Sequence, residues 1–158
     1  MLTPVGWRDL AGLEALKTDP LIFAQMLGGV RSRAQVAAEL AEDIVFWAAH
    51  GVGIWAVREH GGEALLGITG IHARPDGRGM GLRFAFSPES RGHGYAREAA
   101  GAALRYALEV VQLTRIVAVT RETNFESRTV LGAIGMRECE TFLRGGERML
   151  MFESVRRG

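Results

Sequence analysis

The sequence predicts one α+β domain over residues 1–158, with an α/β-type succession of strand and helix in its second half. The chain has the length of one domain, and 47% of its residues are hydrophobic, which is enough for one real core. Helix-periodic and strand-like segments follow one another without an internal repeat, a low-complexity tract or a linker. A single core is therefore expected to hold the whole chain.

Two helices are expected in the first fifty residues. Residues 9–16 form a short helix candidate. Ser32 with Gln35 three residues later resembles a capping box, in which the two residues exchange hydrogen bonds between side chain and backbone. Apolar residues then recur at helical spacing up to about His50, and Gly51 ends this helix.

The next segments predict a hairpin and one further strand. Residues 54–58 and 64–71 flank the turn His60-Gly61-Gly62 and are typical of an antiparallel hairpin. A loop over residues 75–79 leads to a strand over residues 81–86. These strands supply the first part of the expected sheet.

The second half of the chain carries the clearest patterns. Residues 96–111 repeat small apolar residues at spacings of three and four, which lets a helix lie close to a sheet. Residues 116–120 form a nearly continuous apolar run, typical of a central strand buried on both faces. A helix over residues 124–131 is followed by Gly135 as its C-cap glycine, and residues 138–153 predict a closing hairpin.

A glycine-rich turn from Arg91 to Ala96 is the most informative feature of the chain. It follows the apolar strand and the break at Ser87-Pro88, and it leads directly into the alanine-rich helix. Its glycines remove the side chains that would keep a phosphate away from the backbone, and the helix start adds free N–H groups and a positive dipole end. The turn therefore predicts a site for the pyrophosphate of a cofactor.

Composition excludes several other classes of protein. The 19 basic and 18 acidic residues leave no net field that would favour nucleic acid or an anionic membrane. The single cysteine, Cys139, allows neither an internal disulfide nor a Cys-based zinc site, and we expect no metal. No signal peptide is visible and no run approaches the ~20 apolar residues of a membrane span, so a cytoplasmic protein is expected.

Two motifs together resemble the GNAT N-acetyltransferases. The family's acetyl-coenzyme A motif, Arg/Gln-x-x-Gly-x-Gly/Ala, is matched by Arg91, Gly94 and Ala96. The later Asn124-x-x-Ser127 and Val130-Leu131 resemble the RimJ/RimL-like branch, which acetylates the N-termini of ribosomal proteins. A single glycine pattern has low specificity, but two motifs at the right separation and on the right elements are specific.

This resemblance implies a fold and a cofactor site. The fold would be a mixed, mostly antiparallel sheet flanked by helices and splayed at the cofactor strand, with acetyl-CoA as co-substrate. Asn124, Ser127 and Leu131 would lie beside the cofactor. Backbone groups of the splayed strand would pair with the pantetheine amides, and those residues are Phe84, Ala85 and Phe86. Backbone amides of the glycine turn would hold the pyrophosphate, and these belong to Arg91, Gly92, His93, Gly94, Tyr95 and Ala96.

The implied activity is transfer of the acetyl group to a primary amine by direct attack. An α-amino group with a pKa near ~8 is partly neutral at pH 7, whereas a lysine near ~10.4 needs a base, which favours a protein N-terminal α-amine as acceptor. A backbone N–H around Phe86 would polarise the thioester carbonyl. Many relatives protonate the leaving thiolate with a tyrosine late in the chain, which is missing here. Ser127 is the candidate general acid, water is an equal alternative, and a purely helix-capping Ser127 is another.

The general base stays open. Relatives often place a glutamate on the cofactor strand where this chain has Gly81 or Arg83, so that assignment does not transfer. The remaining candidates are Glu63, His72, Glu122 and Glu138. A base acting through water, or no base at all, fits as well.

Other functions have less support in the sequence. A Rossmann site requires Gly-x-Gly-x-x-Gly and a P-loop requires Gly-Lys-Ser/Thr, and neither pattern occurs at the turn. The serious alternative is a non-catalytic module that senses acyl-CoA, because the usual tyrosine and strand glutamate are missing. The acceptor, the acyl-chain preference and a homodimeric state are left open.

Overall fold

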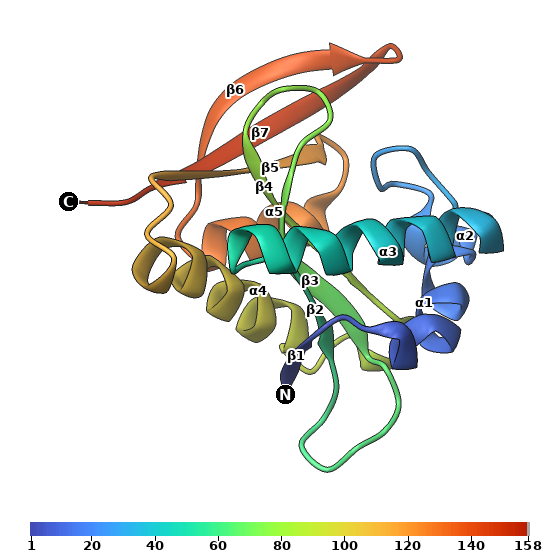
Figure 1. Cartoon of the computed structure of the whole chain (residues 1–158). Coiled ribbons are helices and arrows are strands. Elements are labelled where there is room, and N and C mark those ends of the chain that lie inside the picture. Colours follow the sequence, from blue (N-terminus) through green and yellow to red (C-terminus); the bar gives the residue numbers. More distant parts are fainter. Residues whose placement is uncertain (158) are drawn as a thin grey trace.

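The computed structural model describes residues 1–157, so the last residue of the expected domain lies outside the described residues. Seven strands of this part form one sheet in the order β1-β2-β3-β4-β5-β7-β6, with helices on both faces (Figure 1). All neighbouring strands are antiparallel except β4 and β5. The predicted α+β fold with a mixed, mostly antiparallel sheet is confirmed. Within the described residues, no helix combines the length and the apolar character needed to pass through a membrane.

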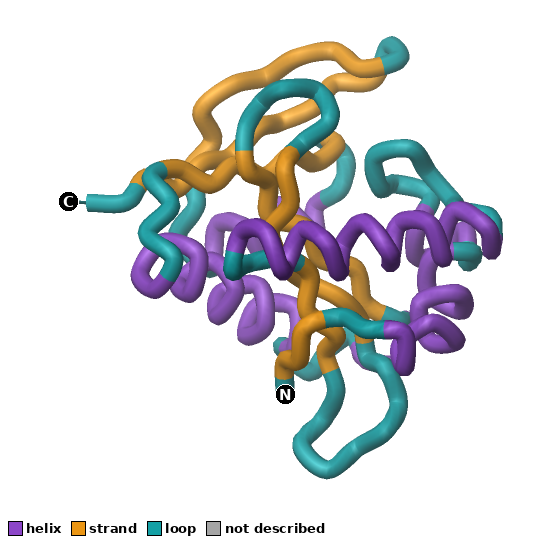
Figure 2. Tube along the Cα trace, viewed as in Figure 1, coloured by secondary structure: helices purple, strands orange, loops and turns teal. Residues whose placement is uncertain are grey.

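Helices and strands are distributed along the whole described chain (Figure 2). The strands are β1 (Leu2–Pro4), β2 (Ile54–Val57), β3 (Gly67–Ala73), β4 (Met80–Phe86), β5 (Arg115–Arg121), β6 (Arg137–Arg144) and β7 (Glu147–Val155). The helices are α1 (Leu10–Lys17), α2 (Pro20–Phe23), α3 (Arg33–His50), α4 (Tyr95–Arg105) and α5 (Phe125–Ala133). Short 3₁₀ turns occur at Trp7–Asp9 and Pro88–Ser90, and a π-helical turn at Tyr106–Val110 extends α4.

Several helix ends follow signals in the sequence. At the start of α3, the Gln35 N–H donates to Ser32 Oγ (3.1 Å) and the Ser32 N–H donates to Gln35 Oε1 (2.8 Å), which is the predicted capping box. Gly51 ends this helix with a φ of 67°, and Gly135 follows α5 with a φ of 93°. Both values lie in the left-handed region that glycine adopts without strain, so the predicted helix ends are confirmed.

Two short elements escape the sequence patterns. β1 has three residues and pairs with β2, and α2 has four residues and begins after Asp19, whose side chain accepts from the Leu21 N–H (2.9 Å). Elements of this length carry too little periodicity to be recognised. The hairpin strand expected from residue 64 begins instead at Gly67, and residues 58–66 form a longer loop than predicted.

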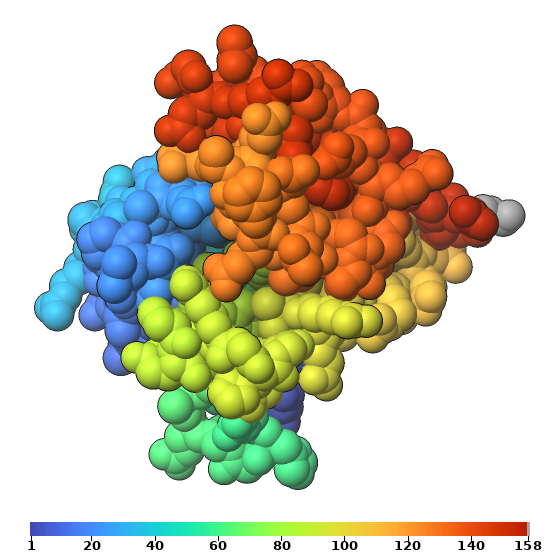
Figure 3. Space-filling view, turned by 180° about the vertical axis from the view of Figure 1, so that it is seen from behind, coloured from blue at the N-terminus to red at the C-terminus, as the bar shows by residue number. Residues whose placement is uncertain are grey.

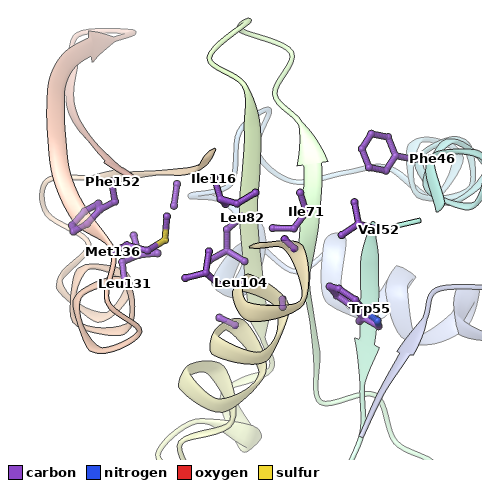
Figure 4. Packing of buried hydrophobic residues seen from close by; sticks show 14 of the residues in the cluster. Phe46, Val52, Trp55, Ile71, Leu82, Leu104, Ile116, Leu131, Met136 and Phe152 are labelled. Carbon is purple, nitrogen blue, oxygen red and sulfur yellow. The ribbon is translucent and has the colours of Figure 1, made fainter. Parts of the chain in front are cut away.

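The core occupies both faces of the sheet. α1, α2 and α3 cover one face, where they pack on strand residues that include Ile68 and Ala85. α4 and α5 cover the other face, and the buried alanines of α4 let that helix lie close to the strands. Figure 4 shows Leu104 of α4 pointing toward Leu82 and Ile116, which come from the neighbouring strands β4 and β5.

The parallel pair of strands opens into a V. β4 pairs along its length with β3, and β5 pairs along its length with β7, but β4 and β5 pair with each other only at Gly81 and Val117. Beyond that point the two strands separate toward their carboxyl ends. The splay expected at this strand is confirmed, and it opens the sheet from its middle rather than from an edge.

Gly70 offers a test of how tightly β2 and β3 are paired. A Cβ at this position would lie 2.1 Å from the Gly53 carbonyl oxygen and 2.7 Å from Ile54 Cα, both backbone atoms that cannot turn aside. Gly70→Ala should therefore lower the free energy of unfolding by about 2–3 kcal/mol, the usual cost of overpacking. The control is Gly132→Ala in α5, where a Cβ meets nothing within 4 Å, and which should raise stability by about 0.5 kcal/mol. Urea unfolding of both variants measures this, and an unaffected Gly70→Ala would contradict the tight pairing.

Candidate active site

A cavity of about 1040 Å³ opens at the splay between β4 and β5. One wall of the cavity consists of the carboxyl ends of β4 and β5, the glycine turn and the start of α5, and we call it the turn side. We call the opposite wall the α3 side, and its charged residues are Lys17, Arg31, Glu39, Glu42, Asp43, His72, Arg74, Arg83 and Arg144. In the space-filling view from behind, the blue N-terminal helices, the yellow-green glycine turn and the orange α5 segment lie side by side (Figure 3). The cavity is large enough for a cofactor-sized ligand.

The glycine turn presents a run of free donors to the cavity. Among the described residues, no backbone or side-chain acceptor binds the successive N–H groups from Gly92 to Arg97, and the first bond of α4 runs from the Glu98 N–H to the Gly94 carbonyl (3.0 Å). Gly92 and Gly94 have φ values of 84° and 77°, and an added Cβ at either position would meet no atom within 4 Å. Free N–H groups at a helix start with open space before them make an anion site.

A buried serine holds this turn in place. Ser90 is 3% exposed, and its hydroxyl donates to the Ser87 carbonyl (2.7 Å) and more weakly to the Leu66 carbonyl (3.2 Å). These bonds tie the 3₁₀ turn before the glycines to the start of β3. Ser90 is not recognisable from the sequence, because a lone serine in a turn carries no specific signal.

The register of β4 decides which of its backbone groups face the cavity. The Ser87 N–H donates to the Leu66 carbonyl (2.9 Å), and Thr69 Oγ1 donates to the Arg83 carbonyl (2.9 Å), so these alternate positions of β4 face β3. Backbone groups of successive residues point to opposite sides in an antiparallel pair. The N–H and C=O groups of Phe84 and Phe86 therefore point into the splay. The expected role of Ala85 is corrected, because its backbone groups face β3, with which they pair, and only its side chain is left to line the cavity.

The start of α5 brings Asn124 and Ser127 to the turn side. Asn124 caps the helix, because its Oδ1 accepts from the Ser127 N–H (3.2 Å). Ser127 contributes its N–H to this cap, so the alternative in which its hydroxyl caps the helix is wrong. The Ser127 side chain is half-buried and lines the cavity, and its hydroxyl has no partner among residues 1–157. Buried Leu131 adds an apolar wall one helical turn further on.

All but one of the residues predicted to bind the cofactor line the cavity. The exception is His93, which is exposed and whose ring centroid lies 5.5 Å from that of Tyr95. The Tyr95 hydroxyl donates to the carboxylate of Glu59 in the loop between β2 and β3, and this hydrogen bond raises the pKa of Tyr95. The phenol is thus engaged by the loop and is not a free acid in the cavity.

On the α3 side, Asp43 and His72 face each other. His72 Nε2 lies 3.7 Å from Asp43 Oδ1, and the imidazole stacks on Phe46 with 4.2 Å between ring centroids. His72 Nδ1 lies 3.0 Å from the Ala73 carbonyl, which can only accept, so Nδ1 carries a hydrogen. Burial raises the pKa of Asp43, although nearby Lys17 and His72 oppose the shift. A carboxylate with a raised pKa is a better proton acceptor at neutral pH.

His72 was among the candidate bases expected from the sequence, whereas Asp43 was not. Asp43 is 8% exposed and lies in helical phase with Val36, Leu40 and Trp47 on the face of α3 that packs on the sheet. A carboxylate in phase with the apolar positions of a helix is unusual, because burial of an unpaired charge is costly. That signal was available in the sequence.

The other three candidate bases are absent from the cavity wall. Glu63 is exposed in the loop between β2 and β3. The remaining two form ion pairs outside the cavity wall: Glu122 with Arg148 (2.7 Å) and Glu138 with Arg128 (3.7 Å). Nowhere in residues 1–157 do three His, Cys, Asp or Glu side chains gather as a metal site requires.

Comparison with known proteins agrees with this geometry. A family model described as acetyltransferase (GNAT) domain matches residues 1–137. Among curated proteins, the FsC-acetyl coenzyme A-N(2)-transacetylase of Aspergillus fumigatus is 39% identical over 59 residues, which cover 37% of this chain. This match spans only 25% of the length of that protein.

Solved structures with the same fold cover nearly the whole chain. The acetyltransferase (GNAT family) of Bacillus anthracis has a TM-score of 0.82 at 21% identity, over 98% of this chain and 93% of that one. The spermidine N-acetyltransferase of Vibrio cholerae, solved with CoA and spermine, has a TM-score of 0.82 at 16% identity, over 99% and 95%. The ribosomal-protein-alanine N-acetyltransferase of Brucella melitensis has a TM-score of 0.78 at 17% identity, over 98% and 99%. At these identities the likeness shows the fold, and the family match over most of the length shows that the chain belongs to the acetyltransferase (GNAT) domain family, which uses acetyl-CoA as acetyl donor.

Proposed function

We propose that this chain, acting as one domain over residues 1–158, transfers an acetyl group from acetyl-CoA to a primary amine. The proposal depends on one observation above all: a single cavity joins a run of free N–H groups at a helix start to a free strand edge on β4. The first suits a pyrophosphate, and the second suits a chain of amides that adds to the sheet like a strand. Membership of the GNAT family supports acetyl-CoA as the ligand.

The turn side fits the extended shape of this co-substrate. The N–H groups from Gly92 to Arg97 would hold the pyrophosphate oxygens, with no side chain of Gly92 or Gly94 in the way. The backbone groups of Phe84 and Phe86 would pair with the pantetheine amides. The apolar wall at Leu131 would flank the arm that leads to the thioester.

The acetyl transfer requires only a few side chains with a chemical role. Acetyl-CoA supplies a thioester carbon that the amine nitrogen attacks, so that a C–N bond forms while the C–S bond breaks. The Phe86 N–H would donate to the carbonyl oxygen as negative charge develops on it. Asp43, with His72 beside it, would accept the proton that the amine loses. Ser127 would act as the general acid that protonates the departing sulfur, and its hydroxyl would regain a proton from solvent.

The acceptor that we propose is an α-amino group, such as the protein N-terminus used by the RimJ/RimL-like branch. The cofactor strand carries no carboxylate, and an amine with a pKa near ~8 is partly neutral at pH 7 without strong assistance. The ribosomal-protein-alanine N-acetyltransferase among the structural relatives supports this acceptor. The spermidine N-acetyltransferase among them represents the competing class of acceptor.

Gly94→Val should weaken acetyl-CoA binding by at least about tenfold, because the new side chain would occupy the space of the pyrophosphate. Gly77→Val is a matched control, since Gly77 has a φ of 76° against 77° for Gly94 and neither Cβ would meet an atom within 4 Å. Both variants should lose similar stability, about 1–3 kcal/mol of backbone strain. Calorimetric titration with acetyl-CoA compares them, and equal affinities would reject the pyrophosphate site.

Ser127→Ala should lower kcat by about tenfold and no more than ~10², with little change in acetyl-CoA binding, the usual size of acid–base assistance. Its stability should stay within about 0.5 kcal/mol of the wild type, because Asn124 and not Ser127 caps α5. Asn124→Ala should instead cost about 1 kcal/mol in urea unfolding. A Ser127→Ala enzyme with wild-type kcat would remove this hydroxyl from the mechanism.

Acceptor class is tested with two peptides of matched sequence, one with a free N-terminus and no lysine, the other with a blocked N-terminus and one lysine. At pH 7 the first should be acetylated faster, by up to the few-hundredfold difference in neutral amine that the pKa values of ~8 and ~10.4 imply. Thiol release and mass spectrometry measure the rates. Faster acetylation of lysine would contradict the proposed acceptor, and tight acetyl-CoA binding without transfer to any amine would favour the sensor.

A further inference from the structure

Two arginines on the α3 side of the cavity have no carboxylate partner among the described residues. The other Lys and Arg side chains of this wall already have ion-pair partners: Lys17 and Arg31 share Glu39, and Arg74 pairs with Asp76. Arg83 and Arg144, by contrast, form no ion pair, and their side chains donate no hydrogen bond to residues 1–157. Their donors are therefore left for a ligand.

Arg83 is the better placed of the two. It follows Leu82 on β4, and like Ala85 two residues later its side chain belongs to the face of the sheet that α3 covers. It is half-buried, and burial lowers the pKa of its guanidinium while the charge of Asp43 opposes the shift. A guanidinium stays protonated at neutral pH in spite of such a shift. A charge removed from water without a partner is costly, and an anion that enters the cavity would relieve that cost.

We propose that Arg83 binds a carboxylate of the acceptor, so that the acceptor is an amine with a carboxylate a few bonds away. This inference rests on the proposed function and names the class of acceptor for the same site. A guanidinium presents its N–H donors as a rigid fork that matches the two oxygens of a carboxylate. No such fit exists for an ammonium or a neutral amide.

Asp43 supplies a negative charge on the same wall as the positive charge of Arg83. It lies near enough to Arg83 for each charge to influence the other, yet the two side chains form no ion pair. Opposite charges held apart on one wall of the cavity match a zwitterion, with its ammonium toward Asp43 and its carboxylate toward Arg83. In this orientation the group that accepts the proton is next to the amine that loses it.

The charge balance of the wall argues against a polyamine. The cations of the α3 side outnumber the carboxylates even when Asp76, the partner of Arg74, is counted with them. The cations are Lys17, Arg31, Arg74, Arg83 and Arg144, against Glu39, Glu42, Asp43 and Asp76. A polycation would bring further positive charge next to the two arginines that lack partners. Like charges in a partly enclosed site repel strongly, because the protein screens them less than water does.

The carboxylate has two possible sources, a free α-amino acid and a peptide that begins with an acidic residue. Three pairs of acceptors distinguish the sources and test the charge: alanine against alaninamide, a peptide beginning with Glu against the same peptide beginning with Gln, and either carboxylate against spermidine. Arg83→Gln removes the charge and leaves a shorter, neutral side chain that can still donate hydrogen bonds. Arg33→Gln is the matched control, because it removes the same charge from a side chain that is 85% exposed on α3.

In the wild type, the carboxylate member of at least one pair should have the higher kcat/KM, and Arg83→Gln should lower that value by about 10- to 100-fold, the range expected for a charge-assisted, bidentate contact. The same variant should change kcat/KM for the carboxamide or Gln member by less than about threefold and leave the KM for acetyl-CoA unchanged. Arg33→Gln should behave as the wild type, and Arg83→Lys should fall between. The pair that responds identifies the source of the carboxylate.

Equal losses for both members of each pair, or a wild type that uses spermidine as well as either carboxylate, would overturn the inference while leaving the proposed acetyl transfer intact. If no acceptor is acetylated, the proposed function fails, and binding decides about Arg83 separately. Calorimetry with alanine and with the Glu peptide, in the presence of CoA, should then show binding to the wild type that Arg83→Gln weakens at least about tenfold. Equal or absent binding in both proteins would reject the anion site. Urea unfolding of Arg83→Gln checks that the variant is folded.

Discussion

The single point of contact between β4 and β5 is the constraint on which the cavity depends. Gly81 and Val117 hold the two strands together at one end, and the apolar side chains around Leu82, Leu104 and Ile116 fill the closed end of the V. Each strand is fixed on its other side by a full antiparallel ladder, so neither can move across to close the gap. The result is a stretch of β-strand backbone that is rigid and yet unpaired, in the interior of a sheet.

Free donors concentrated in one region have an energetic consequence. The N–H groups from Gly92 to Arg97 and the guanidinium of Arg83 contribute little to the stability of the fold, since their protein partners are missing among the described residues. Stability must come from the two apolar clusters on either face of the sheet and from ordinary helix caps such as those at Ser32 and Asn124. Polar groups without a hydrogen-bond partner in the protein are expected where a ligand supplies that partner.

How much of the fold and of the site could be predicted from the sequence depends on how far apart in the sequence the interacting residues lie. The glycine turn, the capping box at Ser32 and the Asn-led helix at residue 124 are local, and the structure places them as expected. Which residues of β4 turn their backbone groups toward the cavity could not be predicted, because pairing with β3 decides it. The backbone role expected of Ala85 therefore falls to its neighbours Phe84 and Phe86. The residues that form the α3 side are the farthest apart in the sequence. Asp43, His72 and Arg83 come from a helix and two strands, and only the packing of α3 on the sheet brings them to one wall.

The cap of α5 also determines the hydrogen-bonding polarity that Asn124 offers to the cavity. Its carbonyl oxygen is occupied by the Ser127 N–H, so the group left free is the amide NH₂, which can only donate. Aspartate, serine or threonine would serve the helix equally well as a cap, but aspartate would present a second acceptor and the hydroxyl residues a shorter reach. Under the proposed function, position 124 would be specified twice, once by the helix that it begins and once by the carbonyl groups of an extended amide ligand. The two demands would thus meet on one amide group, the helix at its oxygen and the ligand at its nitrogen.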